Sequence, residues 1–172
     1  MAQHDLEHYL REYDRLTEDF IDTFTAFAKT EYNVPIAEGR WSPGGYVEHV
    51  LKSERAFARI LSGPMAPAPE GRGADDKCAR LDAELAETRE RISAPATVHP
   101  EPDVRYSASE QLDAFVDGRA EVRATVEFAP DPGAVATAYA HPIFGEMTVT
   151  EWLYFQALHG ERHRRQVEAA RR

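Results

Sequence analysis

Residues 148–170, TVTEWLYFQALHGERHRRQVEAA, have the pattern of one long amphipathic helix. Thr148 followed three residues later by Glu151 forms a capping box, which predicts that the helix begins here. At about 100° per residue, one stripe of this helix carries Trp152, Phe155, His159, His163 and Gln166. Two histidines among large apolar side chains are a functional signal, because buried imidazoles need hydrogen-bond or metal partners.

Four other stretches have helical periodicity, and none shows sustained strand alternation. We expect helices at residues 3–30, 43–61, 75–93 and 107–128, joined by loops at 31–41, 62–74, 94–106 and 129–147. Ser42 before Pro43 is a helix-start signal, and Ser107 with Glu110 forms a second capping box. The pattern predicts an all-α fold in a single domain, residues 1–172: an antiparallel four-helix bundle with an additional helix in a connection.

Composition narrows the class of partner. The chain has 172 residues, a formal net charge of −10 and one cysteine, Cys78. The acidic balance argues against nucleic acid, because phosphate binding depends on clustered Lys and Arg. No run approaches the roughly 20 apolar residues of a membrane span, and a single cysteine excludes an internal disulfide. We therefore expect a cytoplasmic protein that acts on a small-molecule substrate and contacts neither nucleic acid nor a membrane.

The histidines predict a metal site. His159 and His163 are four residues apart, which on a helix places their Cβ atoms roughly 5–6 Å apart. His49 lies on the inward stripe of the helix expected at 43–61 and would complete a three-nitrogen site with open positions, the layout of a catalytic metal. The alternative is a group of core histidines with ordinary partners. His4 and His8 share the spacing but flank the first helix's stripe, and we expect them at the surface.

The residues around the pair exclude two metal chemistries. Gly160 stands where a zincin carries Glu, and Glu161 lies about 200° round the helix from His159, facing away from the site. A di-iron bundle needs Glu three residues before a ligand histidine, and no histidine in this sequence has one. We therefore expect nitrogen ligands only, with water in the remaining positions. Because the ligands must be neutral, protons should compete with the metal below about pH 6.

Four further residues are candidates for the lining of a pocket at the site: Trp152, Gln156, Gln166 and His141. Gln156 and Gln166 could orient a ligand or satisfy polar groups in the core. His141 could lie at the mouth of the site or stabilise a turn. Trp41 is interpreted as a core residue before the second helix, and Cys78 as a packed or exposed residue rather than a nucleophile.

Several segments resemble, in order, the signature of the DinB/YfiT superfamily. Residues 41–51, WSPGGYVEHVL, resemble its first half, and HPIFG at 141–145, TVTEW at 148–152 and HGERHRRQ at 159–166 resemble its second half. The resemblance spans nearly the whole chain. It implies an antiparallel four-helix bundle with an atypical crossover, a homodimer, and a divalent metal, usually nickel or zinc, held by His49, His159 and His163.

The resemblance also implies an activity class. The superfamily includes transferases for low-molecular-weight thiols such as bacillithiol and mycothiol, a maleylpyruvate isomerase, and metal-dependent hydrolases. We expect a metal-dependent transferase with a low-molecular-weight thiol cosubstrate, because metal coordination favours the thiolate. The alternatives are a hydrolase that activates water at the same site, or a non-catalytic module that binds a metal or a small molecule. The extra helical stretch at 75–93 departs from the family pattern and affects the rim of the pocket.

Overall fold

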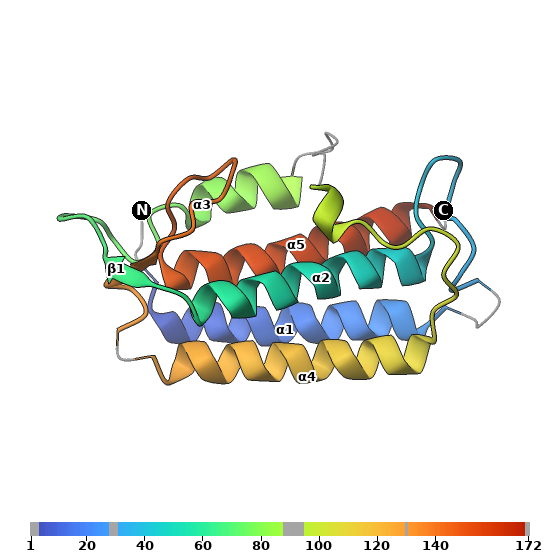
Figure 1. Ribbon diagram of the computed structural model, residues 1–172, viewed down its shortest axis with the longest axis horizontal. Helices are drawn as coiled ribbons and strands as arrows, with labels where there is room; N and C mark the ends of the chain where they lie inside the picture. The colour runs from blue at the N-terminus through green and yellow to red at the C-terminus, as the bar shows by residue number, and fades with distance from the viewer. Residues whose placement is uncertain (1–3, 28–30, 88–94, 130, 171–172) are drawn as a thin grey trace.

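The computed structural model of the chain describes residues 4–27, 31–87, 95–129 and 131–170. Four long helices run alongside one another: α1 Leu6–Thr25, α2 Pro43–Leu61, α4 Ala108–Glu127 and α5 Val149–Ala170 (Figure 1). α1 packs mainly on α5 and α4, and α2 packs mainly on α4 and α5, so α1 and α2 stand at opposite corners. The predicted four-helix bundle is confirmed.

Three of the long helices begin at the residues that the sequence predicts. The Ser42 hydroxyl accepts a hydrogen bond from the amide of Gly45 at 3.1 Å, and Ser107 caps α4. At α5 the capping box is complete: the Glu151 amide donates to Thr148 Oγ1 at 3.1 Å, and the Thr148 amide donates to Glu151 Oε2 at 3.0 Å. These side chains satisfy amides of the first turn that have no intrahelical acceptor.

Two helical predictions were too long. The first helix spans Leu6–Thr25 rather than 3–30, with Asp5 as its N-cap, and residues 28–30 lie outside the described part of the chain. The additional helix, expected at 75–93, consists of α3 Cys78–Leu81 and the π-helical turn η1 Asp82–Glu87. Residues 88–93 also lie outside the described part. The additional helix in the connection is therefore present, but shorter in the described residues than its polar pattern predicts.

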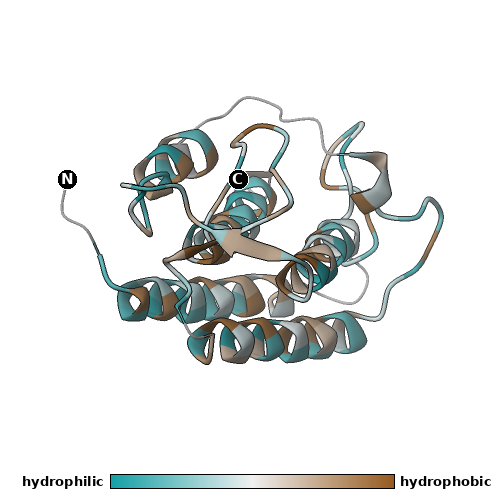
Figure 2. Ribbon diagram, turned by 60° about the vertical axis from the view of Figure 1, so that its left-hand side comes forward, coloured by the Kyte–Doolittle hydropathy of each residue, from teal (hydrophilic) through white to brown (hydrophobic). Residues whose placement is uncertain are grey.

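Two short strands were not predicted. β1 Met65–Pro67 pairs antiparallel with β2 Val135–Thr137, with Met65 opposite Thr137, and the ribbon lies at the front of Figure 2. Strands of three residues are too short to show a period-two pattern, so the sequence indicated only loops here. The ribbon joins the loops at 62–74 and 129–147 at one end of the bundle. A short 3-10 turn, η2 Ala96–Val98, follows the additional helix.

The apolar stripes of the helices meet in a continuous interior. Hydrophobic and hydrophilic positions alternate around each helix, as expected of helices with one buried face (Figure 2). Phe20, Phe24 and Phe115 are fully buried, and the ring centroid of Phe20 lies 4.3 Å from that of Phe24 and 4.4 Å from that of Phe115. Each buried side chain of this size stabilises the fold by roughly 1.5–3 kcal/mol. We therefore expect the bundle to keep its core when no metal is bound.

Within the residues that the structure describes, no helix combines the length and the apolar character that crossing a membrane requires.

Candidate metal centre

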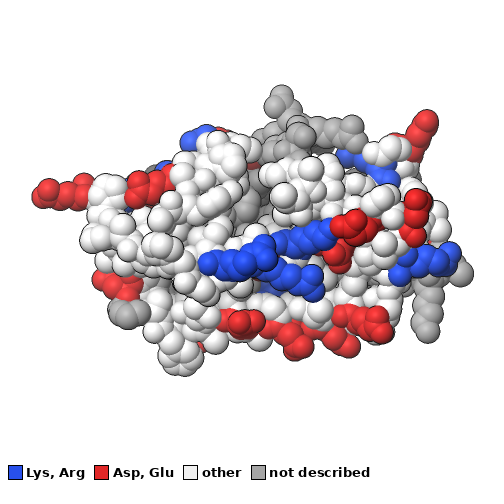
Figure 3. Space-filling model, in the orientation of Figure 1, with Lys and Arg blue, Asp and Glu red and all other residues white. Residues whose placement is uncertain are grey.

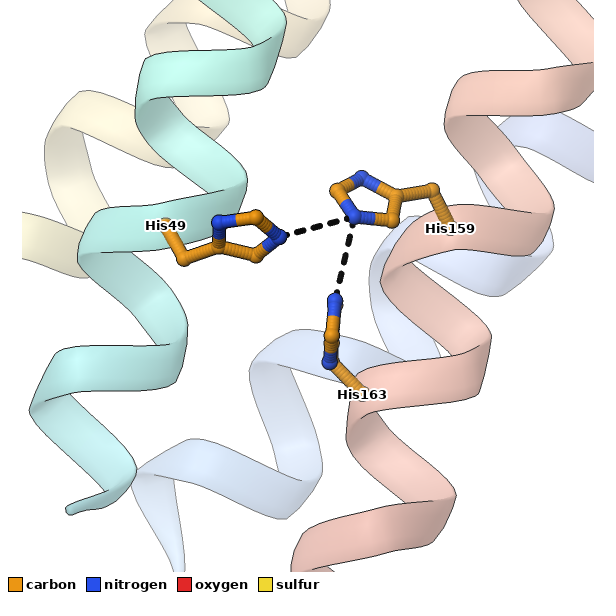
Figure 4. A group of neighbouring side chains, drawn as sticks. All are labelled: His49, His159 and His163. Carbon is orange, nitrogen blue, oxygen red and sulfur yellow. Dashed lines mark hydrogen bonds between the residues drawn. The ribbon is translucent and has the colours of Figure 1, made fainter. Parts of the chain in front are cut away.

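The structure brings the three predicted histidines together. His159 Nε2 lies 3.0 Å from His49 Nε2 and 3.0 Å from His163 Nε2, and the three nitrogens lie within 4.8 Å of one another. Figure 4 shows the rings of His159 and His163 leaving α5 and the ring of His49 reaching them from α2. His49 and His163 are buried, and His159 is half-buried. In a bundle, facing helices place side chains at one point in this way.

In His49 and His163, the hydrogen bond made by Nδ1 leaves Nε2 as the nitrogen that can bind a metal. His49 Nδ1 lies 2.8 Å from the carbonyl oxygen of Val98 in η2, and His163 Nδ1 lies 2.8 Å from Gln166 Oε1. Both oxygens only accept, so each Nδ1 carries the proton and donates it. The lone pairs of both rings are therefore on Nε2, directed at His159. Partners of this kind orient ligand histidines in metal sites.

The donor set fits a cation better than it fits a hydrogen-bonded triad. His159 Nδ1 is buried and has no hydrogen-bond partner among the described residues. If Nδ1 carries the proton, three lone pairs face one another; if Nε2 carries it, that single proton faces two acceptors. A divalent ion accepts all three lone pairs at once. Nitrogens bound to one tetrahedral zinc lie about 3.3 Å apart, close to the 3.0 Å that separates His159 Nε2 from each of the other two Nε2 atoms.

Burial sets the charge of the imidazoles. Loss of solvation lowers the pKa of His49 and lowers the pKa of His159 well below its ordinary value. It lowers the pKa of His163 to about 3. The three imidazoles repel one another when protonated, which adds to the effect at His159 and His163. The ligands are therefore neutral at pH 7, as metal binding requires.

Acidification should release the metal at a lower pH than the sequence indicates. The reference pKa of histidine predicts loss below about pH 6, but burial holds the pKa of His163 near 3, so protons compete poorly above that range. We expect stoichiometric zinc to persist at about pH 5 and to be lost between about pH 5 and 3. Metal analysis after equilibrium dialysis at each pH tests this. Half-loss of the metal already at pH 6 would contradict it.

The same shifts make the metal-free protein sensitive to acid. Because these native-state pKa values lie below that of unfolded histidine, the unfolded chain binds more protons between about pH 6.5 and 3. The free energy of unfolding of the metal-free protein should therefore fall as the pH falls through this window. Chemical denaturation at pH 7 and pH 5 is the matched control for the dialysis, since it separates loss of metal from loss of fold.

The three histidines stand in the wall of a cavity of about 1030 Å³. All four residues predicted to line a pocket are in its wall: Trp152, Gln156, Gln166 and His141. His141 also stabilises a turn, because its Nδ1 accepts the amides of Ile143 and Phe144 at 3.1 and 3.3 Å. Burial lowers the pKa of His141 to about 4. The cavity is large enough to enclose a small organic molecule beside the histidines.

The sequence of the chain matches the model of a known protein family. The sequence profile of the DinB superfamily matches residues 12–167. The chain belongs to the DinB superfamily. Two solved structures have a similar fold: the four-helix bundle protein TT2238 and YfiT from Bacillus subtilis, described as a probable metal-dependent hydrolase with an unusual four-helix bundle topology.

Both solved structures align with nearly the whole of this DinB-superfamily chain. TT2238 has a TM-score of 0.61 and 21% identity, covering 96% of this chain and 99% of its own. YfiT has a TM-score of 0.62 and 13% identity, covering 99% of this chain and 87% of its own. At these identities the likeness establishes the fold alone. No curated protein matches the chain significantly.

Sequence reasoning missed part of the wall of this DinB-superfamily cavity. Trp41, interpreted as a core residue, is half-buried and lines the cavity, with ring centroids 4.9 Å from His49 and 5.5 Å from His99. His99, which had no assigned role, also lines it. Tyr46 packs 5.4 Å from His163. Tyr46 is three residues before His49 on the same helical stripe, and this periodicity could have identified it as a lining residue. Trp41 and His99 lie in loops, where no periodicity predicts the direction of a side chain.

The second histidine pair, Cys78 and Glu161 are not among the residues that line the cavity beside His49, His159 and His163. His4 and His8 stack on each other at 4.1 Å beside a different cavity. His4 is exposed, as predicted, and His8 is half-buried. Cys78 is buried, and desolvation raises its pKa to about 12, which disfavours a nucleophilic thiolate. Glu161 is absent from the lining of the cavity beside the three histidines and pairs with Arg164 instead.

A buried ion pair supports the helix that carries His159. Arg119 Nη2 lies 2.7 Å from Glu54 Oε1 and donates to the carbonyl oxygen of Gln156 at 2.9 Å. Both charged side chains are 3% exposed. A Cβ atom at Gly160 would lie 3.1 Å from Arg119 Nη2, so glycine between the two histidines lets the guanidinium approach α5. The pair therefore ties α2, α4 and α5 together behind the histidines.

Proposed function

We propose that this DinB-superfamily protein is a metal-dependent transferase that joins a low-molecular-weight thiol to an electrophilic small molecule. The observation that carries the proposal is the meeting of three neutral Nε2 atoms at the wall of a cavity of about 1030 Å³. Among the described residues that line this cavity there is no Asp or Glu. In the part of the chain that the structure describes, the site thus combines a place for a metal and room for two small molecules with a lining that has no carboxylate base.

His49, His159 and His163 would hold the metal, for which zinc or nickel is proposed because borderline imidazole ligands suit these ions. When bound, a divalent ion supplies Lewis acidity that favours the deprotonated form of a nucleophile. Val98 and Gln166 hold protons on the outer nitrogens of two ligands and so keep their lone pairs on the site. His49 and His163 are buried and His159 is half-buried, so this side of the site is shielded from bulk water.

A thiol is chosen because the described residues that line the cavity include no Asp or Glu. Hydrolysis of amides or esters gains from a general base that takes a proton from water, and the described lining offers no Asp or Glu for this role. A thiol is far more acidic than water, so it needs no strong base beside a metal. In the reaction a sulfur–carbon bond forms, the bond from carbon to the leaving group breaks, and the thiol proton leaves with that group.

Hydrolysis is the second candidate. YfiT, which shares the fold, is described as a probable metal-dependent hydrolase. His141 lines the cavity and is neutral at pH 7, since burial lowers its pKa to about 4. A neutral imidazole is a potential proton acceptor, although its low pKa makes it a weak base at this pH. This candidate predicts turnover of activated esters in the absence of any thiol.

We expect thiol-dependent turnover that requires His163. Zinc-loaded or nickel-loaded protein is given 1-chloro-2,4-dinitrobenzene and, in turn, glutathione, N-acetylcysteine, bacillithiol or mycothiol, and the thioether is followed by absorbance. His163→Ala should lower the catalysed rate by more than about a hundredfold, since even outer partners of metal ligands contribute 10- to 100-fold. His8→Ala, outside this cavity, is the control. Equal rates in wild type and His163→Ala, or ester hydrolysis without thiol, would reject the proposal.

A further inference from the structure

The charge of the cavity is opposite to that of the protein. The sequence has 30 Asp and Glu against 20 Lys and Arg. Among the described residues of the cavity wall there are three arginines, Arg40, Arg59 and Arg162, and no acidic residue. A cavity of one charge sign raises the local concentration of ligands of the other sign. The cavity therefore favours an anionic molecule over a neutral one.

Arg59 is the arginine best placed to bind such a ligand. Figure 3 shows Lys and Arg side chains gathered over α2, whose basic residues are Lys52, Arg55 and Arg59. Lys52 is already paired with Glu101 at 3.0 Å. Arg59 is exposed, lines the cavity, and has no ion pair with another described residue. A guanidinium group at the edge of an apolar cavity matches the planar geometry of a carboxylate.

The other two arginines are less suited to this role. Arg162 is only 7% exposed and donates to the carbonyl oxygen of Leu85 at 3.3 Å, so it is bound into the wall. Arg40 lies in the loop before α2, at the end of that helix away from Arg59. Among the described arginines of the cavity wall, Arg59 is therefore the one that is both exposed and part of a helix.

The distance along α2 between His49 and Arg59 determines how long a ligand must be to reach both residues. Arg59 follows His49 by ten residues, which is about 15 Å along a helix axis. Side chains on a helix lean toward its N-terminus, so the guanidinium is nearer to the histidines than its Cα. The wall between them contains the apolar side chains of Phe57, Trp152 and Phe155. A ligand that reaches both ends therefore has an apolar or aromatic body and an anionic end.

We propose, building on the proposed transferase function, that this cavity selects a substrate with a carboxylate group, which Arg59 binds while the apolar part lies against Phe57, Trp152 and Phe155. The reacting end of the substrate then lies toward His49, His159 and His163. The carboxylate belongs either to the thiol or to the electrophile, and both have the same chemistry at Arg59. Arg59 is thus a specificity-determining residue.

Binding can be measured without turnover, because both tryptophans of the chain, Trp41 and Trp152, line the cavity. N-(2,4-dinitrophenyl)-6-aminohexanoate quenches tryptophan fluorescence and carries its carboxylate on a flexible chain; its methyl ester is the neutral control. We expect wild type to bind the acid about tenfold more tightly than the ester, the size of one hydrogen bond to a charged group. Arg59→Gln should abolish that preference, and Arg55→Gln, an exposed arginine of α2 outside the cavity wall, should retain it.

Equal binding of acid and ester by wild type, or a preference that survives in Arg59→Gln, would overturn the carboxylate site. These outcomes are separate from the failure of the proposed function. A carboxylate preference with no thiol-dependent turnover leaves the binding site standing and rejects the transferase. Turnover with no preference for acid over ester leaves the transferase standing and rejects the role of Arg59.

Two turnover arms assign the carboxylate to one substrate. In the first, N-acetylcysteine is compared with its methyl ester, with 1-chloro-2,4-dinitrobenzene as the neutral electrophile. In the second, 4-chloro-3-nitrobenzoate is compared with its methyl ester, with the thiol held as N-acetylcysteine methyl ester. We expect about a tenfold preference for the acid in one arm, lost in Arg59→Gln and kept in Arg55→Gln. No preference in either arm contradicts the proposal.

Discussion

Replacing His159 with alanine is expected to abolish stoichiometric binding of zinc and nickel. Its Nε2 atom lies 3.0 Å from the Nε2 atoms of both His49 and His163, so it is the nitrogen common to both short contacts. Without it, two imidazoles from different helices remain, and the loss should exceed the 10- to 100-fold in affinity that outer partners contribute. Isothermal titration of protein purified without a metal-affinity tag, together with elemental analysis, measures the change.

The controls for this experiment come from the second histidine pair. His4→Ala and His8→Ala should leave binding at this site unchanged, because both residues lie at a different cavity. His159→Ala should remain helical by circular dichroism, since the helices bury an extensive apolar core. Loss of stoichiometric metal in the His4 or His8 variants, with retention in His159→Ala, would place the metal at His4 and His8 and contradict the three-histidine site.

The largest effect on stability is expected from Glu54→Ala. Glu54 and Arg119 are each 3% exposed and lie 2.7 Å apart, and Tyr13 also donates to Glu54 at 3.3 Å. Removing the carboxylate leaves the Arg119 cation buried and without its ion-pair partner, which costs about 3–5 kcal/mol. That is a large part of the 5–15 kcal/mol that stabilises a typical domain. Urea denaturation followed by circular dichroism gives the free energy of unfolding for each variant.

A surface pair provides the comparison. Glu7 pairs with Arg11 at 2.6 Å, but their side chains are 76% and 61% exposed, so water screens the interaction. Glu7→Ala should lose only a small fraction of the stability lost in Glu54→Ala. Equal losses in the two variants would show that the buried pair has no special role in tying α2, α4 and α5 together. Denaturation of metal-free protein removes any contribution of the metal to the comparison.

Most helix starts could be predicted because their causes are local. Ser42, Ser107 and Thr148 each cap amides within three residues, so the signal and its effect lie on the same short segment. The stripe that carries His159 and His163 also follows from the helical period alone. The overall bundle then follows from four long apolar stripes that must be buried against one another. The end of the first helical stretch and the start of the third were less predictable, because no clear capping signal marks either position.

The sequence by itself thus determined the helices, their caps and the shared face of His159 and His163, because hydrogen bonds and periodicity within one helix fix all three. The inward stripe of the second helix also made His49 a candidate, but only the tertiary structure decided that it meets this pair from 110 residues away in the chain, and that Val98, 49 residues from His49, accepts a hydrogen bond from its Nδ1. It also decided that Trp41 and Arg59 line one cavity and that β1 meets β2. These contacts depend on how helices pack and loops close, and no periodic pattern within one segment records the position of another.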